Sequence, residues 1–187
     1  MRYRAAILAF LLACSIQPFV ARDPVVHVLV QIPLLAASGY LLPVKARLSA
    51  SATGPLLVLA LTTAIIWMLP RSVDAAIAEP GWTLAKFVSL PLMLGLPLGM
   101  AWARVSPMLR GFAKAQTISM LLFLAFLYSH SPVRICNAYL IDDQVRLGWG
   151  FAIAACLLAV CWLLPAFIGR VPDAAKCRVD DLSVLGH

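Results

Sequence analysis

The sequence predicts an all-α protein, a polytopic transmembrane bundle of about six helices with both termini in the cytoplasm. Three observations predict this fold. First, 63% of the 187 residues are hydrophobic, only 12% are charged, and the mean hydropathy is +0.93, whereas soluble domains carry about 25% charged residues. Second, apolar runs recur at roughly the 17–25 residues that cross a bilayer. Third, the basic residues are distributed unequally between the two sides of these runs.

Charged residues divide the chain into six apolar runs, and lipid offers no water to backbone groups, so each run is expected to be a helix. The first run follows the basic start MRYR and is similar to a signal peptide; we interpret it as a retained first span. Only Arg22 and Asp23 separate the first two runs, so a hairpin that dips in and out of the membrane is the alternative for this pair. The expected spans are 5–21, 24–43, 55–70, 84–103, 116–133 and 147–169, followed by a cytoplasmic tail at 170–187 in a single integral membrane domain, 1–187.

The orientation follows from the basic residues. Ten of the fifteen Lys and Arg fall on the side of the two termini, and five fall on the other side. An excess of Lys and Arg marks the cytoplasmic side, so both termini are expected there. The net charge of +7 is explained in the same way, and without a basic patch interleaved with aromatic residues no nucleic-acid partner is expected.

This topology brings many polar residues to the outward side. The expected outward-face cluster consists of Gln31, Arg71, Asp74, Lys86, Tyr139, Asp142, Asp143 and Gln144. Simpler interpretations stay open. Arg71 and Asp74 are also a typical helix-end pair; Lys86 could snorkel or pair with an acid; and the two adjacent aspartates favour the start of the sixth helix.

Two further patterns have ordinary interpretations in a membrane protein. Trp67 and Trp82 are expected in the interfacial aromatic belt. Gly95 and Gly99 form a small-xxx-small pattern that is typical of helix packing.

The metal-binding pattern centres on His27. Gln31 lies four residues later on the same helical face, and a neutral histidine can bind copper, although a lone histidine more often serves as a hydrogen-bonding group. His130 and Cys136 could complete a ligand set with His27, without forming a recognised spacing. No nucleophile elbow, zinc-protease, phosphate-loop or dinucleotide motif is present, so no catalytic residue and no enzymatic activity are expected.

Three stretches together resemble CtaG-type cytochrome c oxidase assembly proteins, over residues 26–151. They are HVLVQIPLLAASGYLL, WMLPRSVDAAIAEPGWTLAKFVSLPLMLGLPLGMAW and SPVRICNAYLIDDQVRLGWG. The resemblance implies a multi-pass protein of the bacterial inner (cytoplasmic) membrane that acts in copper-site maturation on the outward face of a respiratory-chain oxidase. In it, His27 stands on a family histidine, and Asp143 and Gln144 on a family acid–glutamine pair.

The chain departs from this family at several positions where histidine ligands for copper are expected. Gln31 stands where the family repeats a histidine, and Trp82 and Lys86 stand near further expected histidines. The chain is also short for the family. Two alternatives therefore stay open beside copper-site maturation: a non-catalytic accessory subunit of a respiratory or redox membrane complex, and a small transporter. In each case the lipid bilayer is a partner, and the first two also predict a larger oxidase-like complex.

Overall fold

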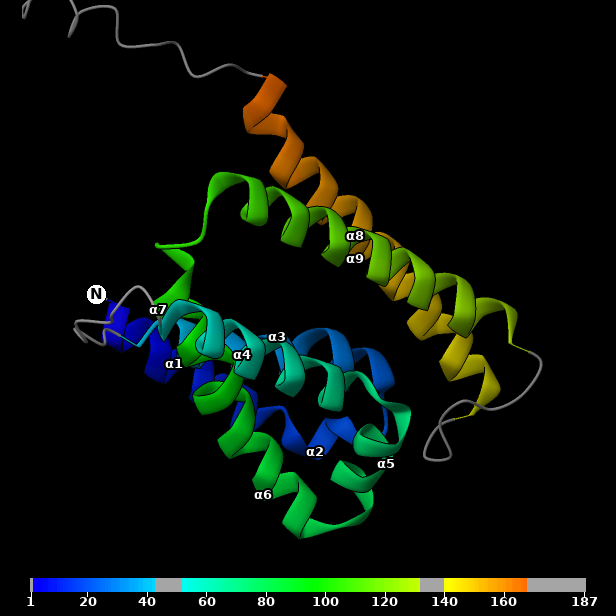
Figure 1. Ribbon diagram of the computed structural model, residues 1–187. Coiled ribbons are helices and arrows are strands. Elements are labelled where there is room, and N and C mark those ends of the chain that lie inside the picture. The colour runs from blue at the N-terminus through cyan, green and yellow to red at the C-terminus, as the bar shows by residue number, and fades with distance from the viewer. Residues whose placement is uncertain (1, 43–51, 132–139, 168–187) are drawn as a thin grey trace, which may run out of the picture.

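A computed structural model describes residues 2–42, 52–131 and 140–167, and this part of the chain is helical, without strands (Figure 1). The prediction of an all-α fold is confirmed. The elements are α1 (Arg2–Ser15), α2 (Gln17–Val20), the π-helix η1 (Val26–Gln31), α3 (Ile32–Tyr40), α4 (Thr53–Met68), α5 (Pro70–Ala78), α6 (Pro80–Ser89), the π-helix η3 (Leu90–Gly95), α7 (Leu96–Trp102), α8 (Pro107–His130) and α9 (Ile141–Phe167).

Three helical stretches of the described chain are long and apolar enough to cross a membrane, namely Pro80–Trp102, Pro107–His130 and Ile141–Leu164. A fourth is added if α4 and α5, which meet at a bend of 71°, form one span. The six spans expected from the sequence are therefore confirmed only in part. The first two predicted spans are short: α1 has 14 residues, or about 21 Å of helix, and Val26–Tyr40 is also one of the shorter apolar helices, against roughly 30 Å of hydrocarbon.

Proline explains where several helices bend or widen. Leu69 is extended before Pro70, as expected for a residue that precedes proline, and this break produces the bend between α4 and α5. Pro91 lies inside the long helix 80–102 and cannot donate a backbone hydrogen bond. The chain is π-helical at Pro91, and η1 likewise ends just before Pro33. The segments that contain Pro33 and Pro91 therefore stay helical because the chain forms wider, π-helical turns next to each proline.

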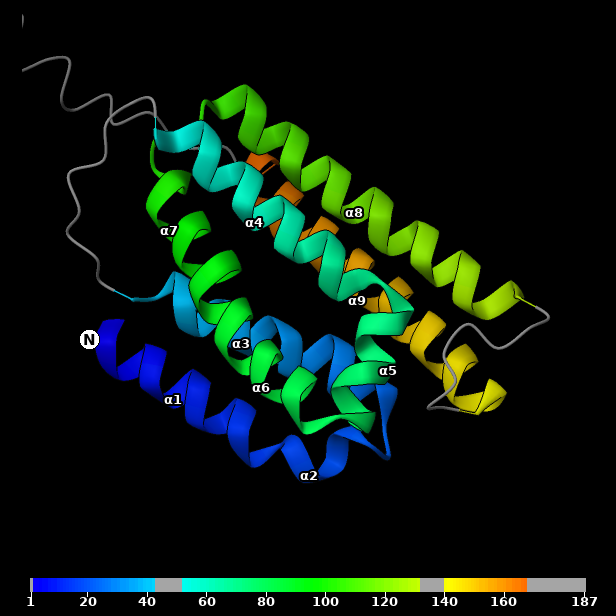
Figure 2. The same cartoon turned by 60° about the horizontal axis from the view of Figure 1, so that its bottom comes forward.

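Successive helices run back and forth between two ends of the molecule (Figures 1 and 2). The 21–25 connection, α5 and the start of α9 lie at one end, which we call the α5 end. The start of α1, the start of α4 and the α7–α8 connection lie at the other.

The closest helix crossing joins α3 to η3 and α7. Gly39 and Gly95 face each other there, and a Cβ added at Gly95 would lie 2.8 Å from the backbone nitrogen of Tyr40. Gly99 continues the contact, since its Cβ would lie 2.7 Å from the Tyr40 carbonyl oxygen. The small-xxx-small pattern therefore serves packing within this chain, which removes it as a contact face for another subunit.

The α8–α9 hairpin packs against the other helices through an apolar cluster at the α5 end. Val28 of η1, Val73 of α5, Tyr128 of α8 and Phe151 of α9 belong to this cluster. The remaining surfaces of α8 and α9 carry many exposed large apolar side chains, as expected of helices that face lipid. A second buried cluster joins α1, α3, α4, α5 and η3, and Phe87 of α6 packs against it; the polar site described next lies beside it.

Candidate functional site

Lys86 of α6 is fully buried at the centre of a polar cluster. Its Nζ lies 2.7 Å from Gln31 Oε1, 3.2 Å from His27 Nε2 and 3.4 Å from Gln17 Oε1. His27 and Gln31 are also fully buried. We call these four residues, Gln17, His27, Gln31 and Lys86, the Lys86 cage.

Local structure explains why the cage forms. Both His27 and Gln31 lie on η1, where a spacing of four residues keeps them on nearly the same face. The Gln31 amide donates to the Ala13 carbonyl at 2.9 Å and to Gln17 Oε1 at 2.8 Å. Ala13 belongs to the last turn of α1, whose carbonyls lack partners within the helix. Gln31 therefore joins the end of α1 to the amine of α6.

The cage consists of neutral groups around one amine. A lysine ammonium has three donors and no acceptor, and its three neighbours each present an acceptor atom. Donation to Nε2 places the single proton of a neutral His27 on Nδ1. Within the described parts of the chain no carboxylate pairs with Lys86. The cage thus satisfies the hydrogen bonds of an ammonium without cancelling its charge.

The prediction that Lys86 snorkels to the membrane surface or pairs with an acid is wrong for the part of the chain that the structure describes. Lys86 lies six residues after Pro80, about 9 Å along the helix, which is close enough to the helix end for snorkelling. The side chain instead turns inward and is 0% exposed, because the amides of η1 and of the α1–α2 junction offer acceptors there. Gln17 was missed by the sequence interpretation, although an amide followed by Pro18 inside an apolar run is an available signal.

The residues proposed as copper ligands are not brought together in the described structure. His130 is exposed at the end of α8, where its ring stacks on Phe126 with centroids 4.6 Å apart. Cys136 and Tyr139 lie outside the described residues. Among the residues that are described, no group of three or more His, Cys, Asp or Glu is arranged to hold a metal. The copper set of His27, His130 and Cys136 therefore stays a prediction.

The acids at the start of α9 occupy its first turn, as the simpler interpretation expects. Asp142 is exposed, Asp143 is half-buried and Gln144 is buried. The Gln144 amide donates to the Tyr128 carbonyl at 3.4 Å, so it links α9 to α8. On α5, Arg71 is exposed and Asp74 is half-buried. These residues share the α5 end with the cage but are not part of it.

The expectation of an interfacial Trp67 is wrong. Its side chain is 4% exposed, and its indole Nε1 donates to Ser89 Oγ at 2.8 Å. Trp82 meets it edge to face, with centroids 6.3 Å apart, and is itself exposed. The pair therefore fastens α4 to α6 instead of marking one level of the bilayer.

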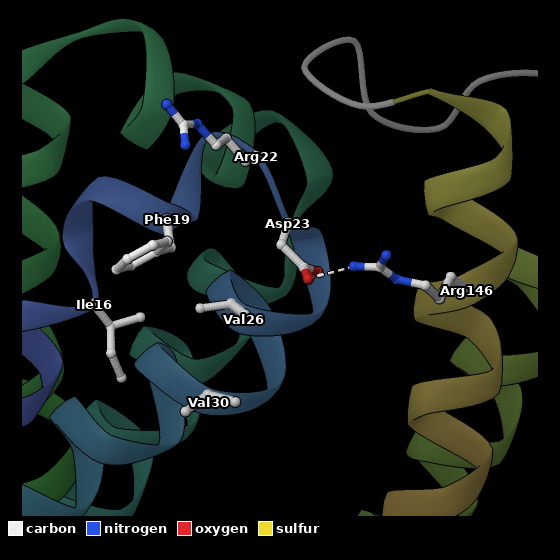
Figure 3. Close-up of a pocket in the computed structure, with 7 residues that line it drawn as sticks. All are labelled: Ile16, Phe19, Arg22, Asp23, Val26, Val30 and Arg146. Atoms are coloured by element: carbon white, nitrogen blue, oxygen red, sulfur yellow. Dashed lines mark ion pairs between the residues drawn. The ribbon is translucent and has the colours of Figure 1, made fainter.

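An ion pair between Asp23 and Arg146 links the 21–25 connection to α9 (Figure 3). Asp23 also accepts a hydrogen bond from the Val25 backbone at 2.9 Å. Partial burial acts to raise the pKa of Asp23, but Arg146 and the backbone N–H groups of Val25 and Val26 outweigh it, so the pKa lies below its ordinary value. Asp23 is therefore an ionised anchor for Arg146.

The fold and site define a helical protein of the membrane class with a buried, caged amine on a candidate membrane span. No family model, curated protein or solved structure matches the chain.

Proposed function

We propose that this chain is a small membrane transporter of protons, which takes up and releases a proton at the Lys86 cage. The observation that supports the proposal is the fully buried Lys86 amine, whose neighbours among the described residues are three neutral acceptors and the Phe87 ring, with its centroid at 5.5 Å. Ionisable side chains inside a membrane are expensive and typically belong to proton relays or solute pathways. The neutral cage does not remove the free-energy cost of burying a charged amine, and this favours a functional role for the amine over a purely structural one.

The cage contains two groups that can exchange a proton. Lys86 Nζ and His27 Nε2 are 3.2 Å apart, within hydrogen-bond reach for transfer. The proton would leave the ammonium for the imidazole, producing a neutral amine and an imidazolium. Gln17 and Gln31 do not titrate; their side-chain oxygens accept from Lys86 Nζ, and the Gln31 amide donates to Gln17, which holds the two acceptors in position.

The helices around the cage contain irregular turns that can rearrange. Two cage residues lie on η1, and α6, which carries the lysine, continues directly into η3. π-helical turns are frequent at functional sites, and interrupted membrane helices form the binding sites of many transporters. Gain or loss of the Lys86 proton changes how many hydrogen bonds the amine donates, so these turns are where a change in helix position is expected.

The test is proton uptake by proteoliposomes that contain a pH-sensitive dye and carry an imposed membrane potential. Wild-type protein should acidify the lumen, and Lys86→Met should reduce the rate to that of protein-free liposomes. Lys114→Met is the matched control, because Lys114 of α8 lies over the Trp162 ring, 5.5 Å from its centroid, outside the cage. His27→Gln, which keeps an acceptor but takes up no proton, should fold and lose uptake. Equal rates for wild type and Lys86→Met, or no uptake by wild type, would contradict the proposal.

The six-span topology with cytoplasmic termini, in a bacterial inner membrane, completes this proposal. It is supported by the ten-to-five distribution of basic residues and by the alternation of connections between the two ends (Figure 2). A C-terminal fluorescent-protein fusion should fluoresce, while alkaline phosphatase fused after Asp23 should be active. An active phosphatase at the C-terminus would reverse the orientation.

Copper-site maturation with an oxidase-like complex is the second candidate function, supported by the sequence resemblance at His27, Asp143 and Gln144. In this candidate His27 would exchange its hydrogen bond with Lys86 for the metal. Metal analysis after Cu(I) loading should give bound copper in wild type and less in His27→Ala. Absence of copper from both proteins would remove this candidate.

A further inference from the structure

A pocket opens at the α5 end between the α1–α2 corner, η1 and α9 (Figure 3). Its volume is about 520 Å³, within the roughly 300–1,000 Å³ that is usual for small-molecule sites. The lining residues are Ile16, Phe19, Arg22, Asp23, Val26, Val30 and Arg146. None of these belongs to the Lys86 cage.

The pocket has an apolar part and a charged part. Ile16, Phe19, Val26 and Val30 supply the apolar part; in the view of Figure 3, Arg22 lies above them, and Asp23 and Arg146 lie to their right. Phe19 is 56% exposed and Val30 is 38% exposed, so their apolar surfaces are open to an occupant. A ligand that fits must therefore be amphipathic.

The charged part has a net charge of +1, from two arginines and one aspartate. Asp23 is paired with Arg146. Arg22 has no ion pair with any residue in the described segments, and the Arg146 side chain is 55% exposed. The ion pair compensates the charge of Arg146, so the positive charge that is left uncompensated belongs to Arg22.

The level of the pocket in the protein indicates what that anion is. Arg22 and Asp23 lie between apolar helices, and Arg146 lies near the start of the apolar span Ile141–Leu164. This is the boundary at which charged side chains meet lipid headgroups and apolar ones meet acyl chains. We infer that the pocket binds an anionic phospholipid, with its phosphate at Arg22 and its first acyl carbons along Phe19 and Val30.

The inference is tested by native mass spectrometry of delipidated protein in mild detergent, with added phosphatidylglycerol or phosphatidylcholine. Wild type should retain one phosphatidylglycerol in preference to phosphatidylcholine. Arg22→Gln should retain about fivefold less, the effect of one surface cation on an anionic lipid. Arg71→Gln is the matched control, because Arg71 is exposed on α5 and does not line the pocket.

Two further measurements distinguish a lipid site from a site for free anions and from a general effect of surface charge. Val30→Trp fills the pocket without changing its charge and should also reduce retention, while size-exclusion chromatography confirms that each variant is folded. Millimolar inorganic phosphate should not displace the lipid. Equal retention of the two lipids, equal retention by Arg22→Gln and Arg71→Gln, or displacement by phosphate would overturn the inference. None of these outcomes depends on proton uptake at Lys86.

Discussion

Replacing Gly95 with alanine should push α3 away from η3 and α7. The new Cβ would lie 2.8 Å from the Tyr40 backbone nitrogen and 2.9 Å from the Gly39 Cα, with the Ala36 carbonyl oxygen closer still. Real Cβ atoms essentially never approach other heavy atoms within 3.0 Å. All three neighbours are backbone atoms, so no side chain can rotate away and the helices themselves must separate.

The size of the effect follows from a comparison with Gly111→Ala. Gly111 is also inside a helix, and a Cβ there would meet nothing within 4 Å. Both substitutions gain the roughly 1 kcal/mol of helix propensity by which alanine exceeds glycine. Their difference therefore isolates the clash, which costs about 1–3 kcal/mol for overpacking. At about 2–4 °C per kcal/mol for a chain of this size, Gly95→Ala should unfold roughly 2–12 °C below Gly111→Ala.

The assay is thermal unfolding of both variants and wild type in one detergent, followed by intrinsic fluorescence and by the monodisperse fraction after heating. Gly111→Ala should unfold at or above the wild-type temperature. If Gly95→Ala unfolds as late as Gly111→Ala, then α3 and η3 do not cross at these glycines. The positions of His27 and Lys86, which that crossing helps to fix, would then also need revision.

Two further predictions concern links between helices. Asp23→Asn should destabilise the protein by at most about 1 kcal/mol at neutral pH, as expected for a partly exposed ion pair. Because the folded pKa of Asp23 is lowered, its stabilisation is present above about pH 4, the unfolded pKa, and is lost as the pH falls through the folded value. Denaturant midpoints from pH 7 to pH 3 should thus converge for wild type and Asp23→Asn, and a gap that stays the same at both pH values would contradict this contribution of Asp23. Trp67→Phe should cost about 0.5–1.5 kcal/mol for the hydrogen bond to Ser89, measured by chemical unfolding beside Trp149→Phe, whose ring is 65% exposed; equal midpoints for the two variants would contradict the Trp67 contact.

The sequence predicted the helical class well because an apolar segment in lipid must form its backbone hydrogen bonds within itself, and a helix does so. It predicted span lengths less well. The expected span 55–70 agrees closely with α4, which ends at Met68, but the sequence did not predict that the chain becomes helical again at Pro70. The amphipathic α5 then continues as a separate helix at an angle of 71°. Hydropathy does not record such a bend, because it depends on backbone geometry.

The site was predicted in part for a similar reason. The expected topology placed His27, Gln31 and Lys86 at one level, and these three side chains do meet. It also grouped them with Asp142 and Arg71, which occupy helix starts nearby and keep to the surface. The direction of each helix decides whether two residues lie at the same depth in the bilayer. Whether their side chains meet in one site depends on the rotation of each helix about its axis. A sequence without a strong amphipathic pattern does not specify that rotation.

The absence of a charged partner within the cage restricts the possible roles of Lys86. A structural lysine in lipid would be expected beside a carboxylate, because paired charges reduce the cost of burial, and the chain has acids nearby at Asp23 and Asp74. Asp23 is instead engaged by Arg146. The cage offers three acceptors and no compensating charge, so losing the proton costs hydrogen bonds while keeping it costs burial of a charge. A group held between two such opposed costs is the kind whose protonation a small change in helix position can reverse, and this is the physical basis for assigning proton exchange to Lys86.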